Sequence, residues 1–501
     1  MSSFNVLWII SDEFRADCIG YLGNPIIKTP NLDNLCEESA VFSNCFAQAT
    51  PCAPTRMCMF TGRYMFSHGC VWNKTPLRCA EENIAFYLKN YGYNPTLIGY
   101  NDYAKDPSIL PPHHPHRSSL SYEYALPGFD HLFQHEYDSP EWYAYLREKG
   151  YPKELCNREY MCQPDVPPEG PGAHLPEYYP ARYKSEHSEC RFITEKAIEY
   201  IDSQKDTPWF LCLNYIKPHS PNLCSDLYLK LYRDTLFPPP IRADLNYYQN
   251  DPYFKRLGKD TCNSLINPTH LQDFRSAYYG MITELDFNLG ILFDYLKSHN
   301  LWDNTLLIFT SDHGEHLGDH FLTGKCHYFD SAYHVPLIIH DPSEQAHATR
   351  GQVINDLVEL IDIAPTICNY LNIPNYPLFQ GENLLPRIHN DIPAINRKAL
   401  FYEYYYYYHL TPEEQEKTEA EKCLICAVRD TKYKCVFFGE EKLSPRLFDI
   451  SSPHGELNNL AADEKYRHLI PHYLSLLLRW RIKNADWRME RWARPLRPYD
   501  E

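Results

Sequence analysis

The chain has 501 residues, which is more than one hydrophobic core usually supports, so we expect one large domain and one smaller domain. Its composition, with 44% hydrophobic and 23% charged residues, is typical of a folded globular protein. The net charge of -17 argues against a nucleic-acid-binding protein but does not exclude a small anionic substrate, because a local basic cluster can outweigh the overall field.

The eighteen cysteines are scattered, and several lie within apolar runs, so they indicate free thiols rather than a disulfide framework. The chain passes from Met1 directly into the apolar run Val6–Ile10, without a basic segment or a cleavage site. That run is far too short to span a membrane. We therefore expect a cytoplasmic protein that binds neither membranes nor nucleic acids.

The run Val6–Ile10 predicts a strand buried on both faces, and it ends at Asp12-Glu13. Similar runs lie at 209–213, 306–310 and 335–339, and the third of these four strands ends at Asp312-His313. Helical patterns separate them, at 31–39, 81–91, 187–203, 271–299 and 356–371. This alternation predicts an α/β sandwich, in which ligands bind beyond the carboxyl ends of the strands.

Residues 104–185 are rich in Pro, His and Tyr, and we interpret them as an insertion on the active-site side that must partly pack. Residues 386–398 resemble a linker, so we predict a catalytic domain over 1–395 and a small subdomain over 396–501. The subdomain should be an antiparallel sheet with one helix, from strand-like runs at 399–408, 423–429, 432–438 and 446–450 and a helical pattern at 464–483. The run Tyr404–Tyr408 indicates either a buried aromatic strand face or an oligomer contact.

A candidate nucleophile lies in the segment Thr50-Pro-Cys52-Ala-Pro-Thr-Arg56, which contains Cys-x-Pro-x-Arg. The segment follows the first strand–helix unit and opens a further helix, which places Cys52 near the predicted ligand edge. Cys52 could also be an ordinary buried residue with Arg56 as an ion-pair partner, or an unmodified thiolate nucleophile.

A candidate metal site is formed by Asp12-Glu13 and Asp312-His313, two ligand-type pairs at the ends of apolar strands. A single Asp at such a position usually caps a helix. Two pairs at one sheet edge instead indicate a divalent cation, and their carboxylates and imidazole favour Mn²⁺, with Zn²⁺, Fe²⁺ or Ca²⁺ as alternatives.

These motifs, with Thr310 to Lys325 and Ser11 to Asp17, resemble the sulfatase branch of the alkaline phosphatase superfamily, and Asp312-His313 is similar to its phosphonate monoester hydrolases. The resemblance implies an alkaline-phosphatase-like mixed sheet between helices. It also implies that a formylglycine-generating enzyme oxidises Cys52 to formylglycine, whose aldehyde hydrates to a gem-diol. One hydroxyl, activated by the metal, then attacks sulfur or phosphorus, and the other drives release of the anion. The related phosphonate hydrolases are homo-oligomers, which implies a dimer or a tetramer here.

The resemblance also implies roles for residues around the substrate. Arg56 would hold the charge of the nucleophile and a substrate oxygen, and Lys325 would contact a second oxygen on the leaving-group side. His219 would act as general acid, although alone it would indicate a structural histidine in a Pro-rich turn. Asn73 and Tyr100 match substrate-contacting residues of the phosphonate hydrolases.

The sequence departs from the family at two places. Glu13 replaces a Gln and adds a negative charge to the site. The segment Gly99-Tyr-Asn-Asp102 lacks the Lys and His of typical sulfatases, and fewer cations suit a singly charged ester. Asp102 could repel an anion or bind a cationic part of the substrate. His327 is either a further substrate contact or a loop histidine.

Together these features predict a metal-dependent hydrolase of phosphonate monoesters and phosphodiesters, with sulfate esters as further substrates. A dedicated sulfatase is the nearest alternative. An inactive family member that serves as a binding protein is the alternative from another class.

Overall fold

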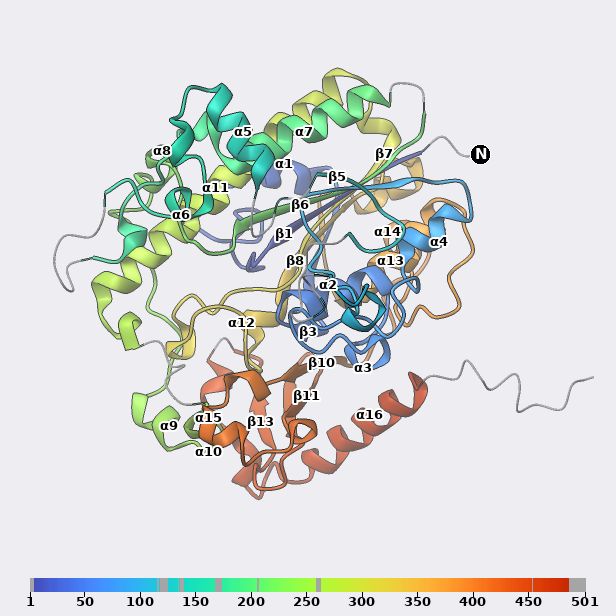
Figure 1. The fold of residues 1–501 in the computed structure, drawn as a ribbon. Helices are drawn as coiled ribbons and strands as arrows, with labels where there is room; N and C mark the ends of the chain where they lie inside the picture. The colour runs from blue at the N-terminus through green and yellow to red at the C-terminus, as the bar shows by residue number, and fades with distance from the viewer. Residues whose placement is uncertain are drawn as a thin grey trace, which may run out of the picture.

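The computed structural model describes residues 4–485, apart from 115–116, 118–124, 134, 136–138, 167–173, 205–206, 258–262 and 453. Two sheets of different size organise the fold (Figure 1). The larger has the order β5-β4-β6-β1-β7-β8-β2-β9. Its strands are β1 (Asn5–Asp12), β2 (Ala40–Phe46), β4 (Pro95–Ile98), β5 (Asp130–Phe133), β6 (Phe210–Pro218), β7 (Thr305–Ser311), β8 (His334–His340) and β9 (Gln352–Glu359).

The large sheet is mixed, as predicted. Strands β4, β6, β1 and β7 are parallel neighbours, whereas β8 runs antiparallel to β7 and to β2. Every residue of β1 is buried, and alternate side chains enter two hydrophobic clusters on opposite faces of the sheet, Trp8 in one and Ile9 in the other. The uninterrupted apolar run in the sequence reflects this burial on both faces.

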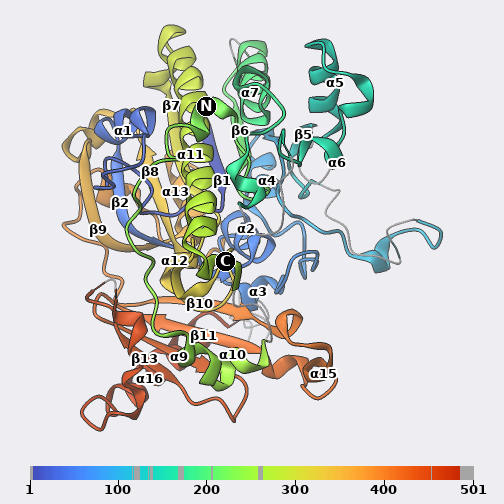
Figure 2. The ribbon, with the colours of Figure 1, turned by 90° about the vertical axis from the view of Figure 1, so that its left-hand side faces the viewer.

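Helices cover both faces of the large sheet, as Figure 2 shows from the side. The helices of the chain are α1 (Pro30–Glu37), α2 (Cys52–Thr61), α3 (Met65–His68), α4 (Ile84–Lys89), α5 (Pro140–Glu148), α6 (Arg158–Met161), α7 (Glu189–Ser203), α8 (Asp226–Leu229), α9 (Leu245–Asn250), α10 (Pro252–Arg256), α11 (Pro268–Ser298), α12 (Asp330–Tyr333), α13 (Ile363–Tyr370), α14 (Leu385–Ile388), α15 (Pro412–Gln415) and α16 (Leu469–Lys483). None of the described helices is long and apolar enough to cross a lipid bilayer.

The expected helix over 356–371 is wrong in its first half. Residues up to Glu359 continue strand β9 and pair in parallel with β2, and α13 begins only at Ile363. The buried Glu359 and Asp362 carboxylates accept each other's backbone N–H groups at this junction, and Arg397 donates to Asp362. The pairing with β2 and the ion pair with Arg397 are long-range contacts that fix the strand end, whereas the local pattern alone favoured a helix.

The smaller sheet has the order β13-β12-β11-β10-β3, with β10 (Leu400–Tyr405), β11 (Leu424–Arg429), β12 (Tyr433–Phe438), β13 (Arg446–Asp449) and β3 (Ala49–Thr50). Four of these strands match the runs predicted for the C-terminal region, and α16 packs against them. Tyr404 and Tyr406 are fully buried, whereas Tyr408 is 56% exposed, so only alternate members of this tyrosine run form a buried aromatic face in the monomer. The short strand β3 pairs in parallel with β10 and directly precedes Cys52.

The predicted insertion over 104–185 contributes a strand to the large sheet as well as a wall of the site. Strand β5 pairs with β4 at the sheet edge, and helices α5 and α6 lie beside α7 on the side of the molecule that carries the carboxyl ends of the strands (Figure 1). Trp142 and Leu146 of α5 are buried in the same hydrophobic cluster as α7. The segment is therefore packed along its helices, as its length required.

Candidate active site

The predicted site residues meet at the carboxyl edge of the four parallel strands. Asp12 ends β1, and Asp312 directly follows β7. His219 follows β6, and the segment carrying Tyr100 follows β4. Because neighbouring parallel strands end at one edge, residues up to 300 positions apart in sequence converge here.

Gly99 makes the turn after β4 feasible. Its φ of +93° lies in the left-handed region, and a Cβ added there would lie 2.3 Å from the Asn214 carbonyl oxygen of β6. Only glycine allows the backbone to approach so closely. This turn brings Tyr100 and Asp102 over the site, and Asp102 itself has a φ of +55°, which Asp and Asn tolerate better than other residues.

Arg56 is the central cation of the site and is fully buried. It lies one turn after Cys52 on α2, and its Nε donates to Asp312 Oδ2 at 2.9 Å while Nη2 donates to Asp12 Oδ2 at 3.2 Å. Nη2 also reaches the Tyr100 hydroxyl at 3.0 Å. The guanidinium therefore contacts residues at the carboxyl ends of β1, β4 and β7.

Asn214 of β6 also binds Arg56, through its side-chain oxygen at 2.8 Å from Nη1, and it was missed in the sequence. Its signal was a polar residue at the end of the apolar run that began at Trp209. Strand β6 continues to Pro218, and Asn214 lies opposite Ile10 of β1, two residues before Asp12.

Asp12, Cys52, Asp312 and His313 form one compact group, with ligand-type atoms all within 4.8 Å of one another. His313 Nε2 lies 3.2 Å from Cys52 Sγ and 3.6 Å from Asp12 Oδ1. Asp12 Oδ1 is buried and has no hydrogen-bond partner among the described residues. An unpartnered buried carboxylate oxygen is costly, so this group fits a divalent cation well.

The charges in this group perturb one another. Burial, and then the nearby Asp312, raise the pKa of Asp12 above its usual value. Burial also raises the pKa of Asp102, to about 7, with Arg56 opposing that rise. Burial raises the pKa of the Cys52 thiol well above its usual range, and Asp12 adds to the effect. The protein alone thus disfavours a free thiolate at Cys52.

The Glu13 carboxylate lies within 4.8 Å of the ligand-type atoms of Asp12 and His219, and it also faces Lys325. Its Oε2 lies 3.6 Å from both Lys325 Nζ and His219 Nε2. Burial would raise its pKa, but Lys325 and His219 lower it to about 2. Its backbone is fixed at a φ of +68°, with the N–H donating to Asp312 Oδ1.

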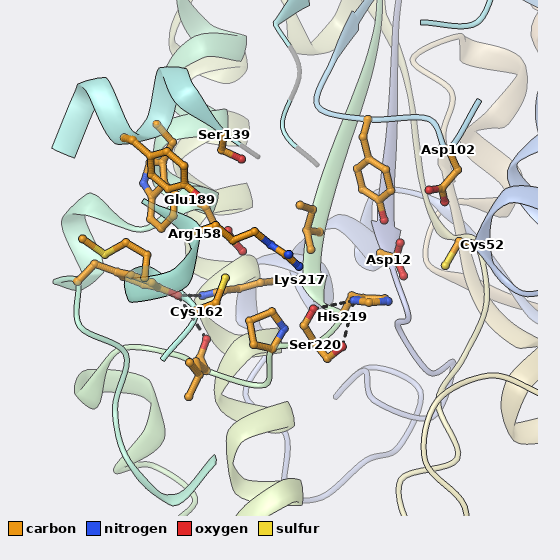
Figure 3. Close-up of a pocket in the computed structure, with 18 of the residues that line it drawn as sticks. Asp12, Cys52, Asp102, Ser139, Arg158, Cys162, Glu189, Lys217, His219 and Ser220 are labelled. Atoms are coloured by element: carbon orange, nitrogen blue, oxygen red, sulfur yellow. Dashed lines mark hydrogen bonds between the residues drawn. The ribbon is translucent and has the colours of Figure 1, made fainter. Parts of the chain in front are cut away.

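A cavity of about 220 Å³ opens onto the nucleophile, and we call it the nucleophile pocket. Figure 3 shows Asp12, Cys52 and Asp102 at one end and Arg158, Cys162 and Glu189 at the other. Its remaining lining residues are Asn73, Tyr100, Ser139, Trp142, Tyr143, Met161, Tyr183, Ile216, Lys217, His219, Ser220, Pro221 and Leu223. Asn73 also accepts the Ala53 N–H at 3.0 Å, which anchors it beside the start of α2.

His327 lies outside this pocket, in a neighbouring cavity that also contains Lys325. Its ring is buried, and Nδ1 lies 3.0 Å from the Tyr253 hydroxyl. Burial lowers its pKa well below the usual value for histidine. The structure thus brings together the other predicted site residues and places His327 in the neighbouring cavity, which Lys325 also lines.

All the described cysteines are free thiols. This agrees with the interpretation of the cysteine pattern as unpaired residues.

Comparisons with known proteins agree with this geometry. A sulfatase family model matches residues 4–373, and a model described as N-sulphoglucosamine sulphohydrolase, C-terminal, matches residues 318–483. The multifunctional alkaline phosphatase superfamily protein PehA of Trinickia caryophylli is 33% identical over 97% of this chain and 96% of its own length. An arylsulfatase of Clostridium perfringens is 26% identical over 95% of this chain and 94% of its own length.

Among solved structures, the phosphonate monoester hydrolase of Agrobacterium radiobacter superposes with a TM-score of 0.88 at 30% identity, covering 97% of this chain and 96% of that one. The fold, the matched family model and these full-length relatives lead to one assignment. The chain belongs to the sulfatase family of the alkaline phosphatase superfamily and is an ester hydrolase.

Proposed function

We propose that the protein hydrolyses phosphonate monoesters and phosphodiesters, and sulfate esters less well, with a formylglycine made from Cys52 as nucleophile. The observation that carries this is the group around Cys52. Its thiol, at the start of α2, lies near His313 and the unpartnered oxygen of Asp12, with Arg56 beside them. The structural similarity to phosphonate monoester hydrolases and the family match support the substrate class.

Asp12, Asp312 and His313 would hold a divalent cation, for which we propose Mn²⁺, and Glu13 would complete the set. Bound there, the cation would lower the pKa of the attacking hydroxyl and neutralise substrate charge. Arg56 lies against the same two aspartates, so it balances their charges, and it would contact the oxygens of the hydrated formylglycine.

The attacking oxygen of the hydrated Cys52-derived aldehyde would form a bond to phosphorus while the bond to the leaving oxygen breaks. His219 would give its proton to that leaving oxygen, and Lys325 would stabilise the charge that develops there. Both side chains lie 3.6 Å from Glu13, which orients them on one side of the site. The second hydroxyl would then expel the product and restore the aldehyde.

The scarcity of cations near Asp102 favours phosphorus esters that carry one negative charge. Arg56 is held by Asp12, Asp312 and Asp102, so little of its charge remains for a dianion. A dedicated sulfatase remains the second candidate, because the family also contains the arylsulfatase named above.

Steady-state kinetics on an aryl sulfate, an aryl phosphodiester and an aryl phosphonate with the same leaving group test the proposal. We expect the two phosphorus esters to have the higher kcat/KM. A preference for sulfate above about a hundredfold, or about 2.7 kcal/mol, would establish the sulfatase instead. The peptide containing Cys52 should weigh about 18 Da less than its unmodified form after coexpression with a formylglycine-generating enzyme.

We further propose a cytoplasmic homo-oligomer, a dimer or a tetramer. Light scattering of the purified protein and fractionation of the source cells test these two points. A catalytically silent binding protein would instead keep its biological effect in the Cys52→Ala variant.

A further inference from the structure

Two cavities meet at the centre of the site. The nucleophile pocket is one; the second, of about 600 Å³, we call the lysine pocket because Lys325 lines it. The pockets share Cys162 and three residues of the segment after His219, namely Ser220, Pro221 and Leu223. They therefore adjoin along this segment.

The catalytic groups are divided between the pockets. Cys52 and Asp12 line only the nucleophile pocket, whereas Lys325 and Glu13 line only the lysine pocket. His219 lines the nucleophile pocket, and its Nε2 approaches Glu13 of the other. The reacting centre must lie between Cys52 and Lys325, so an ester bound there has access to both cavities.

This arrangement bears on the number of organic groups in the substrate. A sulfate monoester has one organic substituent, whereas a phosphodiester or a phosphonate monoester has two. Resting on the function proposed above, we propose that the substrate carries two organic groups, one in each pocket. The retained group occupies the nucleophile pocket and the leaving group occupies the lysine pocket.

In-line displacement determines this assignment. The attacking and leaving oxygens lie on opposite sides of phosphorus, so the leaving group points away from Cys52. Of the two pockets, Lys325 lines only the lysine pocket and Cys52 only the nucleophile pocket, so we assign the leaving group to the lysine pocket. In the reaction, the Cys52-derived oxygen would bond to phosphorus as the phosphorus–oxygen bond to this group breaks. The leaving oxygen would take the proton of His219, whose Nε2 lies 3.6 Å from Glu13 of the lysine pocket, and an alcohol would leave through that pocket.

The walls indicate the character of each group. Trp142, Tyr143 and Met161 give the nucleophile pocket an aromatic and apolar wall. The Arg158 side chain extends from that end toward the middle of the pocket (Figure 3). The lysine pocket combines polar groups such as Gln163 and Asn222 with apolar ones such as Phe274. An apolar or aromatic retained group fits the first wall, and a leaving alcohol with both polar and apolar parts fits the second.

Bulky substitutions that narrow one pocket at a time test the assignment. Ile216, half-buried on β6, lines only the nucleophile pocket, and Thr323, exposed, lines only the lysine pocket. Ile216→Trp and Thr323→Trp would be assayed on para-nitrophenyl phenyl phosphate, para-nitrophenyl methyl phosphate and para-nitrophenyl sulfate. Gln163→Trp, on another wall of the lysine pocket, is the matched control for Thr323→Trp, and thermal unfolding verifies that all variants fold.

Ile216→Trp should lower kcat/KM for the phenyl diester about tenfold more than for the methyl diester or the sulfate, since a crowded pocket discriminates by that order. Thr323→Trp and Gln163→Trp should lower kcat/KM to the same extent for all three substrates, because the three substrates share one leaving group. Equal losses with Ile216→Trp, or a selective loss of the phenyl diester with Thr323→Trp, would overturn the assignment. Wild-type protein that cleaves only the sulfate would overturn the proposed function as well. This result distinguishes a failure of the proposed function from a failure of the pocket assignment alone.

Discussion

Replacing Arg56 with Met should destabilise the protein by removing the one cation that contacts three buried carboxylates. In the described structure Arg56 lies 2.9 Å from Asp312, 3.2 Å from Asp12 and 3.4 Å from Asp102. Methionine fills a similar volume without a charge. The lost unfolding free energy therefore comes from the missing charge rather than from a new cavity. Breaking a buried ion pair from one side costs about 3–5 kcal/mol of unfolding free energy, which sets the expected size.

The pH dependence of this loss separates charge from packing. Without Arg56 the pKa values of the three carboxyls rise in the folded state, so the folded variant binds more protons than the unfolded chain. Its stability is then largest at low pH and falls as pH rises through those raised pKa values. Urea unfolding of metal-free protein should show a loss near the full value at about pH 8 and a smaller loss at about pH 5.

Two controls complete the experiment. Arg56→Lys retains the charge and should lose less stability than Arg56→Met. Added Mn²⁺ should restore more stability to Arg56→Met than to wild type, because a cation bound only by the folded state stabilises it, by about 2.7 kcal/mol at a hundred times its Kd. An identical loss at both pH values, with no differential effect of Mn²⁺, would refute the electrostatic explanation.

Three further outcomes follow from the site and its surroundings. Asp102→Asn should make metal-free protein more stable than wild type above pH 7, because burial raises the pKa of Asp102 to about 7 and makes its ionised form unfavourable in the fold. Urea unfolding across pH measures this, and the same pH dependence of the unfolding free energy in both proteins would contradict it. His219→Ala should reduce kcat more for esters of weakly acidic alcohols than for para-nitrophenyl esters, and equal losses would remove His219 as the general acid. Lys217→Met should lower the free energy of unfolding by about 3–5 kcal/mol, because Lys217 is buried 2.8 Å from Glu284. Circular dichroism during urea unfolding measures this loss, and a loss near zero would show that the ion pair does not stabilise the fold.

The sequence by itself determined the two central strands and what ends them. Apolar runs without polar interruption indicate burial on both faces, and Asp12 and Asp312 follow such runs directly. Because parallel neighbours end at one edge, their meeting followed from the strand assignment alone. Cys52 and Arg56 lie one helical turn apart, so their shared orientation was also a local property.

Pairing between distant segments decided the rest. Residues 356–359 form strand β9 because β2 offers a partner, although their pattern favours a helix. The C-terminal sheet reaches the nucleophile through β3, a contact that connects Thr50 with Tyr404 and that no local pattern signals. The position of the Glu13 carboxylate, 3.6 Å from both Lys325 and His219, likewise depends on groups that lie far away in sequence. Local patterns specify which faces are buried, whereas the partners that bury them, and so the pockets between them, exist only in the folded chain.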